Sequence, residues 1–269
     1  MNLRQSEQAP LLAQPEQQQK KKNALLYCYQ QAIAQRHYPG YPIQADRLLL
    51  DQIPHDAHGH IALGDSGPWV AGAPLPTRAE QLTDVLHNIG YPKMCVLDAD
   101  YRPLHPWWRD MVQNPAIGGV VGKGFYYNWG ANYTADVAVV AHDARQMPHL
   151  LLIQRTDTGE WALPGGFINA AESSKAAAVR ELHEETRLHL DSTMASAHKL
   201  YSGPVLDIRT TLHAWTETNL WLFKTSLASL PTIHAGDDAR NAQWVALTDV
   251  PHNLYGSHPV LVDMVLSQI

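Results

Sequence analysis

Hydrophobic and polar residues form clear blocks mainly in the second half of the chain. ADVAVVAH at residues 135–142 and HLLLIQR at 149–155 are apolar runs with β-branched residues, a pattern typical of strands near the centre of a sheet. NLWLFKT at 219–225 and AQWVALT at 242–248 predict further strands, and HPVLVDMVLSQI at 258–269 predicts a closing helix. The pattern therefore predicts several strands followed by a terminal helix.

Another helix is predicted among these strands. GGFINAAESSKAAAVRELHEETRLHL, residues 165–190, is rich in alanine and carries four glutamates and two arginines. One helix inserted among several strands, with another at the end, predicts an α/β sandwich in which helices cover both faces of a mixed sheet.

The first part of the chain differs in composition. Residues 1–24 are rich in Gln, Lys and Pro and offer little to bury, so we expect a disordered tail. NALLYCYQQAIAQ, starting at Asn23, predicts a short helix. Frequent Gly and Pro predict loops with short strands over 38–78, and TRAEQLTDVLHNIG, residues 77–90, predicts a capped helix.

The expected organisation thus has three parts. The tail at 1–24 is followed by a smaller α+β region at 25–117, and an α/β domain occupies 118–269. With 269 residues, 45% of them hydrophobic, the chain is long enough to bury a substantial core.

Charge and cysteine content narrow the function classes. The net charge of −6 comes with scattered Lys and Arg, so no basic stripe for nucleic acid is expected. No apolar run approaches the roughly 20 residues of a membrane span, and the polar N-terminus resembles neither a secretory signal nor a transit peptide. Cys28 and Cys95 are too few for a disulfide framework, which favours a cytoplasmic protein.

Three short motifs offer other chemistry. His55, His58 and His60 in HDAHGH could be metal ligands, but a Gly/Pro-rich loop without a second ligand pair favours a solvated segment. GDSG at 64–67 resembles the nucleophile loop of trypsin-like proteases. In those proteases the catalytic His and Asp precede this loop, whereas GDSG lies in the N-terminal part of this chain. GGVVGKG at 118–124 lacks the Ser or Thr of a phosphate loop and is expected to be a turn.

The glutamates of the predicted helix share one side. Spacings of three and four residues bring Glu181, Glu184 and Glu185 together, while Val179, Leu182 and Thr186 face another way. A solvated helix with ion pairs to the neighbouring arginines is one interpretation. However, Glu181 and Glu185 repel each other at i, i+4, and converging carboxylates are what Mg²⁺ requires. Spacing alone leaves both interpretations open.

The longer pattern resembles the Nudix box. Gly166, then Glu172, then Arg180-Glu181-Leu182, then Glu184-Glu185 and an apolar Leu188 are in register with it; Arg187 stands where the family usually has Gly. The flanking WALPGG, VLDIRTTLHAW and LYGSH are similar to the mitochondrial-type ADP-ribose pyrophosphatase branch, which is related to the ADP-ribose-sensing domain of a melastatin-type cation channel. This resemblance covers about residues 118–269, and members of the branch also lose the late Gly of the box.

The resemblance implies a Nudix α/β/α sandwich, preceded by a smaller cap region, and a metal site. It implies that Glu181, Glu184 and Glu185 bind Mg²⁺, with Mn²⁺ as the alternative, and that the carbonyl of Gly165 or Gly166 adds an oxygen. It also implies that Arg180 orients Glu181. Glu172 would support the loop or a further metal, or would serve only as a charge at the helix N-terminus.

The resemblance also implies a substrate site. Asp207 and Arg209 match residues that contact the distal ribose and the diphosphate; the alternative is a surface ion pair. Further residues are candidates for the nucleotide or for packing: Tyr255, His258, Trp129, Asn132 and Asp136.

The activity implied is Mg²⁺-dependent hydrolysis of ADP-ribose to AMP and ribose 5-phosphate. Two alternatives are a non-catalytic ADP-ribose sensor and a Nudix pyrophosphatase acting on another nucleoside diphosphate-linked substrate. Sensors tend to lose the glutamate after Arg180, and the intact Glu181 favours the enzyme. The expected partner is a small molecule, with neither nucleic acid nor membrane, and no oligomeric state is implied.

Overall fold

The computed structural model describes residues 15–35, 96–97, 103–113, 126, 129–190, 195–225, 230–236 and 239–269. The predictions for HDAHGH, for GDSG, for GGVVGKG and for the helix at 77–90 lie outside these residues. Within them, no helix is both long enough and apolar enough to cross a membrane.

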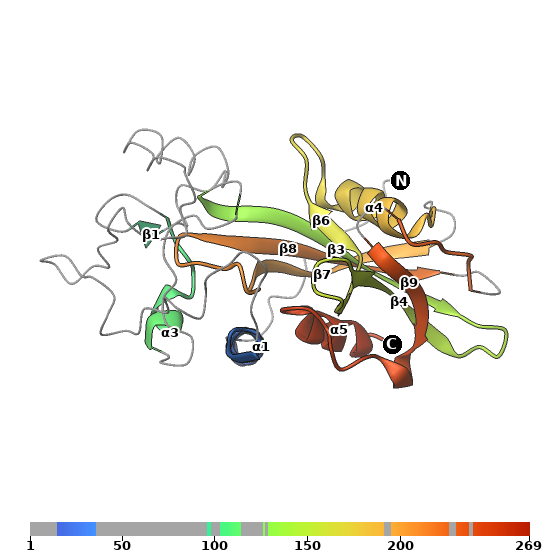
Figure 1. The fold of residues 1–269 in the computed structure, drawn as a ribbon, viewed down its shortest axis with the longest axis horizontal. Coiled ribbons are helices and arrows are strands. Elements are labelled where there is room, and N and C mark those ends of the chain that lie inside the picture. The colour runs from blue at the N-terminus through green and yellow to red at the C-terminus, as the bar shows by residue number, and fades with distance from the viewer. Residues whose placement is uncertain are drawn as a thin grey trace, which may run out of the picture.

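A seven-stranded mixed sheet forms the centre of the molecule (Figure 1). Its strands are β3 (Gly130–His142), β4 (Pro148–Arg155), β5 (Trp161–Ala162), β6 (Gly165–Phe167), β7 (Ala195–Val205), β8 (Ala214–Thr225) and β9 (Ala239–Ala246). The order is β5-β4-β3-β8-β7, with β6 also paired to β3 and β9 to β4. Strands β3 and β8 run parallel, and the other pairs are antiparallel.

Helices cover both faces of this sheet. In β3, Val137 and Val139 face α4 (Ser174–Thr186), whereas Ala138 and Val140 share a core with α1 (Pro15–Gln35) and α5 (His258–Leu266). The change of face at every residue follows from the two-residue period of a strand. Figure 1 shows α4 on one side of the sheet and α1 and α5 on the other. The predicted α/β/α sandwich is confirmed, as are the strand pair 135–155 and the closing helix.

The N-terminal helix corrects one prediction. Residues 15–24, expected to be disordered, form the first part of α1. Leu25 and Tyr29 of the same helix are fully buried, and Lys22 pairs with Asp110 at 2.9 Å. The apolar second half anchors the helix on the sheet, and the polar first half continues it because Gln, Lys and Glu are good helix formers.

The described part of 25–117 also contacts the large domain. It contains α1 from Leu25 onward, β1 (Val96–Leu97), β2 (Pro103–Leu104) and α3 (Trp108–Gln113), which is an α+β content. His105 N–H donates to the carbonyl of Leu212 at 2.8 Å, and Tyr29 Oη donates to the carbonyl of Thr210 at 2.7 Å. These elements therefore pack against the loop that leads into β8; the boundary at 117 stays a prediction.

Candidate active site

A pocket of about 520 Å³ lies beside the sheet, where Thr134 and Asp136 of β3 contribute to its lining. Strands β3, β4 and β6, helices α4 and α5 and the loop between β7 and β8 all contribute to it. Ten of the sequence-predicted residues line it: Asp136, Gly165, Gly166, Arg180, Glu181, Glu185, Asp207, Arg209, Tyr255 and His258. The pocket thus joins the helix of the box to the Asp-x-Arg loop.

Helix α4 presents its carboxylates because its ends and its apolar side are fixed. Ser173 Oγ accepts a hydrogen bond from Ala176 N–H at 3.2 Å and caps the first turn. Leu182 is fully buried against the sheet. Since Leu182 faces the core, Glu181 and Glu185 lie on the side next to β6.

Two glycines let β6 pass close to these carboxylates. A Cβ atom on Gly166 would overlap the carboxylate of Glu181, and one on Gly165 would overlap Asp136 and the carbonyl of Ala135. Strand pairing places Asp136 opposite Gly165. The glycines therefore bring Asp136, Glu181 and Glu185 around one short stretch of backbone.

The three carboxyls around β6 disfavour one another's charge. Burial raises the pKa of Glu185 to about 8, against a hydrogen bond from Gly165 N–H at 2.9 Å, and Glu181 adds to the rise. Burial also raises the pKa of Asp136 to about 6, although Thr218 Oγ1 donates to it, and Glu181 again contributes. The pKa of Glu181 is raised by burial despite Arg180. This end of the pocket favours a bound cation.

Arg180 is the principal cation of this region. Its Nη1 donates to Glu181 at 2.7 Å and to Glu184 at 2.8 Å, and its Nε and Nη2 donate to Glu172 at 3.0 Å each. Nη2 also donates to the carbonyl of Phe167 at 2.8 Å. The predicted contact between Arg180 and Glu181 is present, and Glu172 supports its loop by accepting from Asn169 N–H at 3.0 Å.

The donor set suits a hard divalent cation, but the side chains do not yet surround one. Carboxylates and backbone carbonyls are the oxygens that Mg²⁺ prefers. In the described part of the chain, however, no three His, Cys, Asp or Glu side chains are placed to hold a metal ion together. Glu181 and Glu184 instead share the guanidinium of Arg180, and Glu184 lies outside the pocket.

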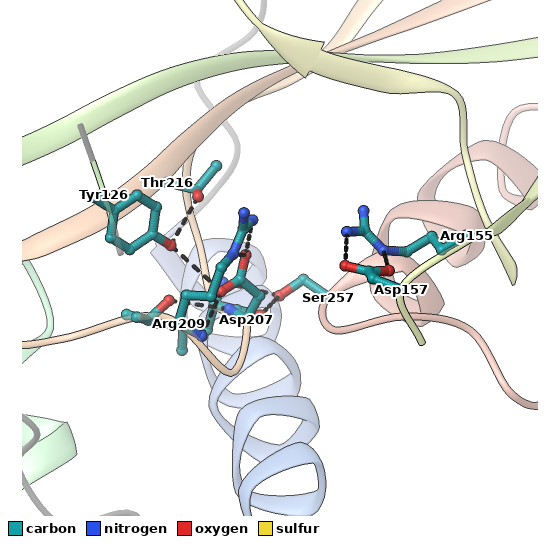
Figure 2. A network of polar contacts seen from close by, with 9 residues as sticks. Tyr126, Arg155, Asp157, Asp207, Arg209, Thr216 and Ser257 are labelled. Atoms are coloured by element: carbon teal, nitrogen blue, oxygen red, sulfur yellow. Dashed lines mark hydrogen bonds and ion pairs between the residues drawn. The ribbon is translucent and has the colours of Figure 1, made fainter. Parts of the chain in front are cut away.

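The opposite end of the pocket contains an ion pair (Figure 2). Asp207 accepts from Arg209 Nε at 3.0 Å, from its Nη2 and from its backbone N–H at 2.7 Å. Tyr126 Oη bridges Asp207 and Thr216. Burial alone would raise the pKa of Asp207, but the charge and hydrogen bonds of Arg209 lower it below its ordinary value. Asp207 is therefore ionised and rigidly held.

Tyr255 and His258 lie beside this pair. His258 Nδ1 accepts from Leu163 N–H at 3.1 Å, and burial lowers its pKa to about 3, so the ring is neutral and Nε2 carries the proton. The ring of Tyr255 stacks under Arg155, whose Cζ lies 4.2 Å from the ring centroid. The buried Tyr255 Oη has no hydrogen-bond partner among the described residues.

Four predicted site residues do not line the pocket. Trp129 is buried near His213, with ring centroids 6.0 Å apart, and Asn132 donates to the carbonyl of Gly130 at 3.1 Å. Trp129 directly precedes β3 and Asn132 lies near its start, whereas the lining residues of this strand are Thr134 and Asp136. Glu172 and Glu184 are the other two, and both contact Arg180.

Several lining residues were missed from the sequence: Arg155, Asp157, Thr216 and Ser257. Arg155 ends a strand, a position where polar residues often serve a site, and that signal could have found it. Thr216 and Ser257 have no local signal, because they reach the pocket only through sheet pairing and through the packing of α5.

Comparison with known proteins agrees with this architecture. Residues 132–264 match the model of the NUDIX domain. The matched residues are those of the sandwich and its box helix, so this part of the chain is similar to a NUDIX domain.

The chain is similar to three curated relatives. The chain is 34% identical over 172 residues to "Putative nudix hydrolase 6" of Caenorhabditis elegans, covering 61% of this chain and 62% of that one. It is 30% identical over 185 residues to the mitochondrial ADP-ribose pyrophosphatase of Rattus norvegicus, covering 57% and 53%. A third relative is the transient receptor potential cation channel subfamily M member-like 2 of Nematostella vectensis, 27% identical over 71% of this chain and 13% of the channel. The match thus spans somewhat more than half the length of the first two relatives.

Proposed function

We propose that this protein hydrolyses ADP-ribose to AMP and ribose 5-phosphate with the help of Mg²⁺. The observation that carries the proposal is that one pocket has mutually repelling carboxyls at one end and the buried Asp207–Arg209 pair at the other. A molecule with a diphosphate next to a ribose fits both ends. The relationship to an ADP-ribose pyrophosphatase supports the same substrate.

The metal would be held by carboxylates of α4 and by backbone oxygen of β6. Glu181, Glu184 and Glu185 and the carbonyl of Gly165 are the proposed ligands, with Mn²⁺ as an alternative ion. When bound, the ion supplies charge neutralisation at the diphosphate and a more acidic water. Asp136 of β3 lies near these carboxylates, although the resemblance had implied a role at the nucleotide end.

The chain's own residues divide the remaining work. Water attacks one phosphorus, the bridging P–O bond breaks, and a glutamate of α4 accepts the proton of the water. Arg180 orients Glu181 through its 2.7 Å hydrogen bond. Asp207 accepts hydrogen bonds from ribose hydroxyls, and Arg209 contacts the diphosphate.

A substrate panel tests the proposal. The protein is incubated with ADP-ribose, NAD, ADP-glucose or diadenosine compounds in the presence of Mg²⁺, and the release of AMP is followed. ADP-ribose should be cleaved fastest, and preferential cleavage of another compound would assign the reaction to a different substrate. Omission of Mg²⁺ with EDTA present should stop the reaction.

A non-catalytic ADP-ribose sensor is the second candidate. It is supported by the similarity to a cation channel subunit. It is also supported by the ion pairs of Arg180 with Glu181 and Glu184, because these pairs occupy two proposed metal ligands. ADP-ribose that binds in calorimetry but survives incubation with Mg²⁺ would establish the sensor and overturn the enzyme.

A further inference from the structure

Arg155 lies in the pocket but belongs neither to the box nor to the Asp-x-Arg loop. It is the last residue of β4, and the pairing of β4 with β9 shifts register between Gln154 and Arg155. A bulge of this kind redirects a side chain from the regular alternation of a strand, and bulges are frequent beside active sites. In Figure 2 the Arg155 guanidinium points toward the Asp207–Arg209 pair.

The charge of Arg155 acts on both ends of the pocket. Among the carboxyls near β6, it opposes the rise in pKa of Asp136 and of Glu185. At the other end, it contributes to the lowered pKa values of Asp207 and His258. The geometry agrees with this, because Arg155 lines the same pocket as Asp136, Glu185 and Asp207 and its guanidinium lies over the ring of Tyr255.

The guanidinium keeps part of its donor capacity for a ligand. Its Nε and Nη2 donate to Asp157 at 2.9 and 2.6 Å, and no other side-chain acceptor contacts it within the described residues. The Arg155–Asp157 pair is partly exposed, with 27% and 32% of the two side chains accessible. Such a pair is weak enough for a doubly charged anion to compete with the carboxylate.

Tyr255 adds a second unused donor at the same place. Its ring lies beneath Arg155, and its buried hydroxyl has no partner in the described structure. A buried hydroxyl without a partner is costly, and a ligand oxygen would relieve that cost.

We propose, on the basis of the function above, that Arg155 binds the diphosphate between the metal end and the Asp207–Arg209 pair, exchanging Asp157 for phosphate oxygens. Tyr255 Oη donates to the same group. Arg155 thus determines specificity for a diphosphate over an uncharged linker, and Asp157 holds the guanidinium in place until the ligand arrives.

Metal-free binding of inorganic pyrophosphate tests this assignment. Calorimetry with EDTA present is performed on the wild type, on Arg155→Met, and on Arg145→Met as a control that removes an exposed arginine from the β3–β4 turn. Arg155→Met should bind pyrophosphate about 10- to 50-fold more weakly, and Arg145→Met should match the wild type. Equal affinity of Arg155→Met and wild type would overturn the proposal.

Asp157→Asn separates a ligand role from a structural one. Both variants break the Arg155–Asp157 pair, but only Arg155→Met removes the guanidinium. Asp157→Asn should therefore keep or improve pyrophosphate affinity, and a loss as large as that of Arg155→Met would make the pair merely structural.

Kinetics with ADP-ribose keep this test apart from the proposed function. In Arg155→Met, KM should rise about 10-fold or more with a smaller change in kcat, because the contact is made in the ground state as well. Hydrolysis by Arg155→Met with unchanged KM would refute the role of Arg155 and leave the activity intact. Absence of hydrolysis in the wild type would refute the activity, while the pyrophosphate result would still decide the role of Arg155.

Discussion

The two ends of the pocket bury carboxylates in opposite ways. Asp207 has its own cation, Arg209, which lowers its pKa even though the group is buried. Glu185 is also buried, but its carboxylate accepts a hydrogen bond from Gly165 N–H rather than from an arginine; burial raises its pKa to about 8 although Arg155 opposes the rise. Asp207 is therefore compensated by a cation of the chain itself, whereas within the described residues Glu185 is compensated by none at hydrogen-bond distance. This difference agrees with the proposed roles, in which the carboxyls near β6 hold an ion and Asp207 contacts the ribose.

The largest expected effect comes from removing a charge at the metal end. Glu181→Gln keeps the shape of the side chain but removes one proposed ligand, so kcat for ADP-ribose should fall on the order of 10³-fold. AMP release at saturating Mg²⁺ measures the change, and an unaltered circular dichroism spectrum shows that the fold is kept. Near-normal turnover would remove α4 from the mechanism.

At the Asp207–Arg209 end of the pocket, removal of a carboxylate should affect stability. Asp207→Ala leaves Arg209 without its carboxylate, and removing one partner of a buried ion pair costs about 3 kcal/mol. Urea unfolding measures the loss. The matched control is Asp157→Ala in the partly exposed pair with Arg155, which should cost less than about 1 kcal/mol. Equal losses at the two sites would contradict the contrast in burial.

The buried carboxyl of Glu185 should make the metal-free protein less stable at higher pH. The pKa of Glu185 is about 8 in the folded chain and about 4.3 when unfolded. The folded state thus binds more protons, so this contribution is full below about pH 4.3 and is lost as the pH rises toward 8. With EDTA present, the free energy of unfolding should fall by on the order of 3 kcal/mol between pH 5 and pH 8.

Glu185→Gln provides the control for this pH dependence. Its amide does not titrate, so most of the decrease between pH 5 and pH 8 should disappear. If the variant and the wild type follow the same curve, the buried charge of Glu185 is not the cause.

The smallest effect is expected at the off-pattern residue of the box. Arg187 ends α4 with φ of 57°, a left-handed conformation that glycine adopts without steric cost. Arg187→Gly should therefore stabilise the protein by about 0.5–1 kcal/mol in thermal or urea unfolding. Arg187→Ala is the control, since it removes the same charge and keeps the Cβ atom. A gain of equal size in both variants would assign the effect to charge.

The sequence predicted the parts of the fold that depend on local periodicity. The carboxylates of α4 were found because residues three and four apart share a side of a helix, and β3 and β4 were found from their apolar runs. Strand β7 was missed because ASAHKLYSGPV is polar and contains Gly203 and Pro204. Such residues are typical of edge strands, and within the described residues β7 is the edge strand next to β8.

The site was predicted less completely than the fold because much of it depends on pairing between distant segments. Asp136 lies near the carboxyls of α4 because the pairing of β3 with β6 places it opposite Gly165. Its neighbours in the sequence do not predict this position. Arg155 reaches the pocket at a β-bulge, and the hydrophobic periodicity of the sequence does not predict a bulge. Trp129, Asn132 and Asp136 were expected near the nucleotide because all three lie in one stretch covered by the resemblance, but only Asp136 lines the pocket.

The most direct test of the central claim is ³¹P NMR of ADP-ribose incubated with the wild-type protein and Mg²⁺. In the proposed function, one pocket combines a cation-dependent carboxyl end with the Asp207–Arg209 end that contacts the ribose, and the diphosphate between them is cleaved. The diphosphate signals should give way to equal amounts of two phosphomonoesters, AMP and ribose 5-phosphate, and should persist with EDTA. Unchanged diphosphate signals in the presence of Mg²⁺, under conditions where calorimetry detects ADP-ribose binding, would contradict the account.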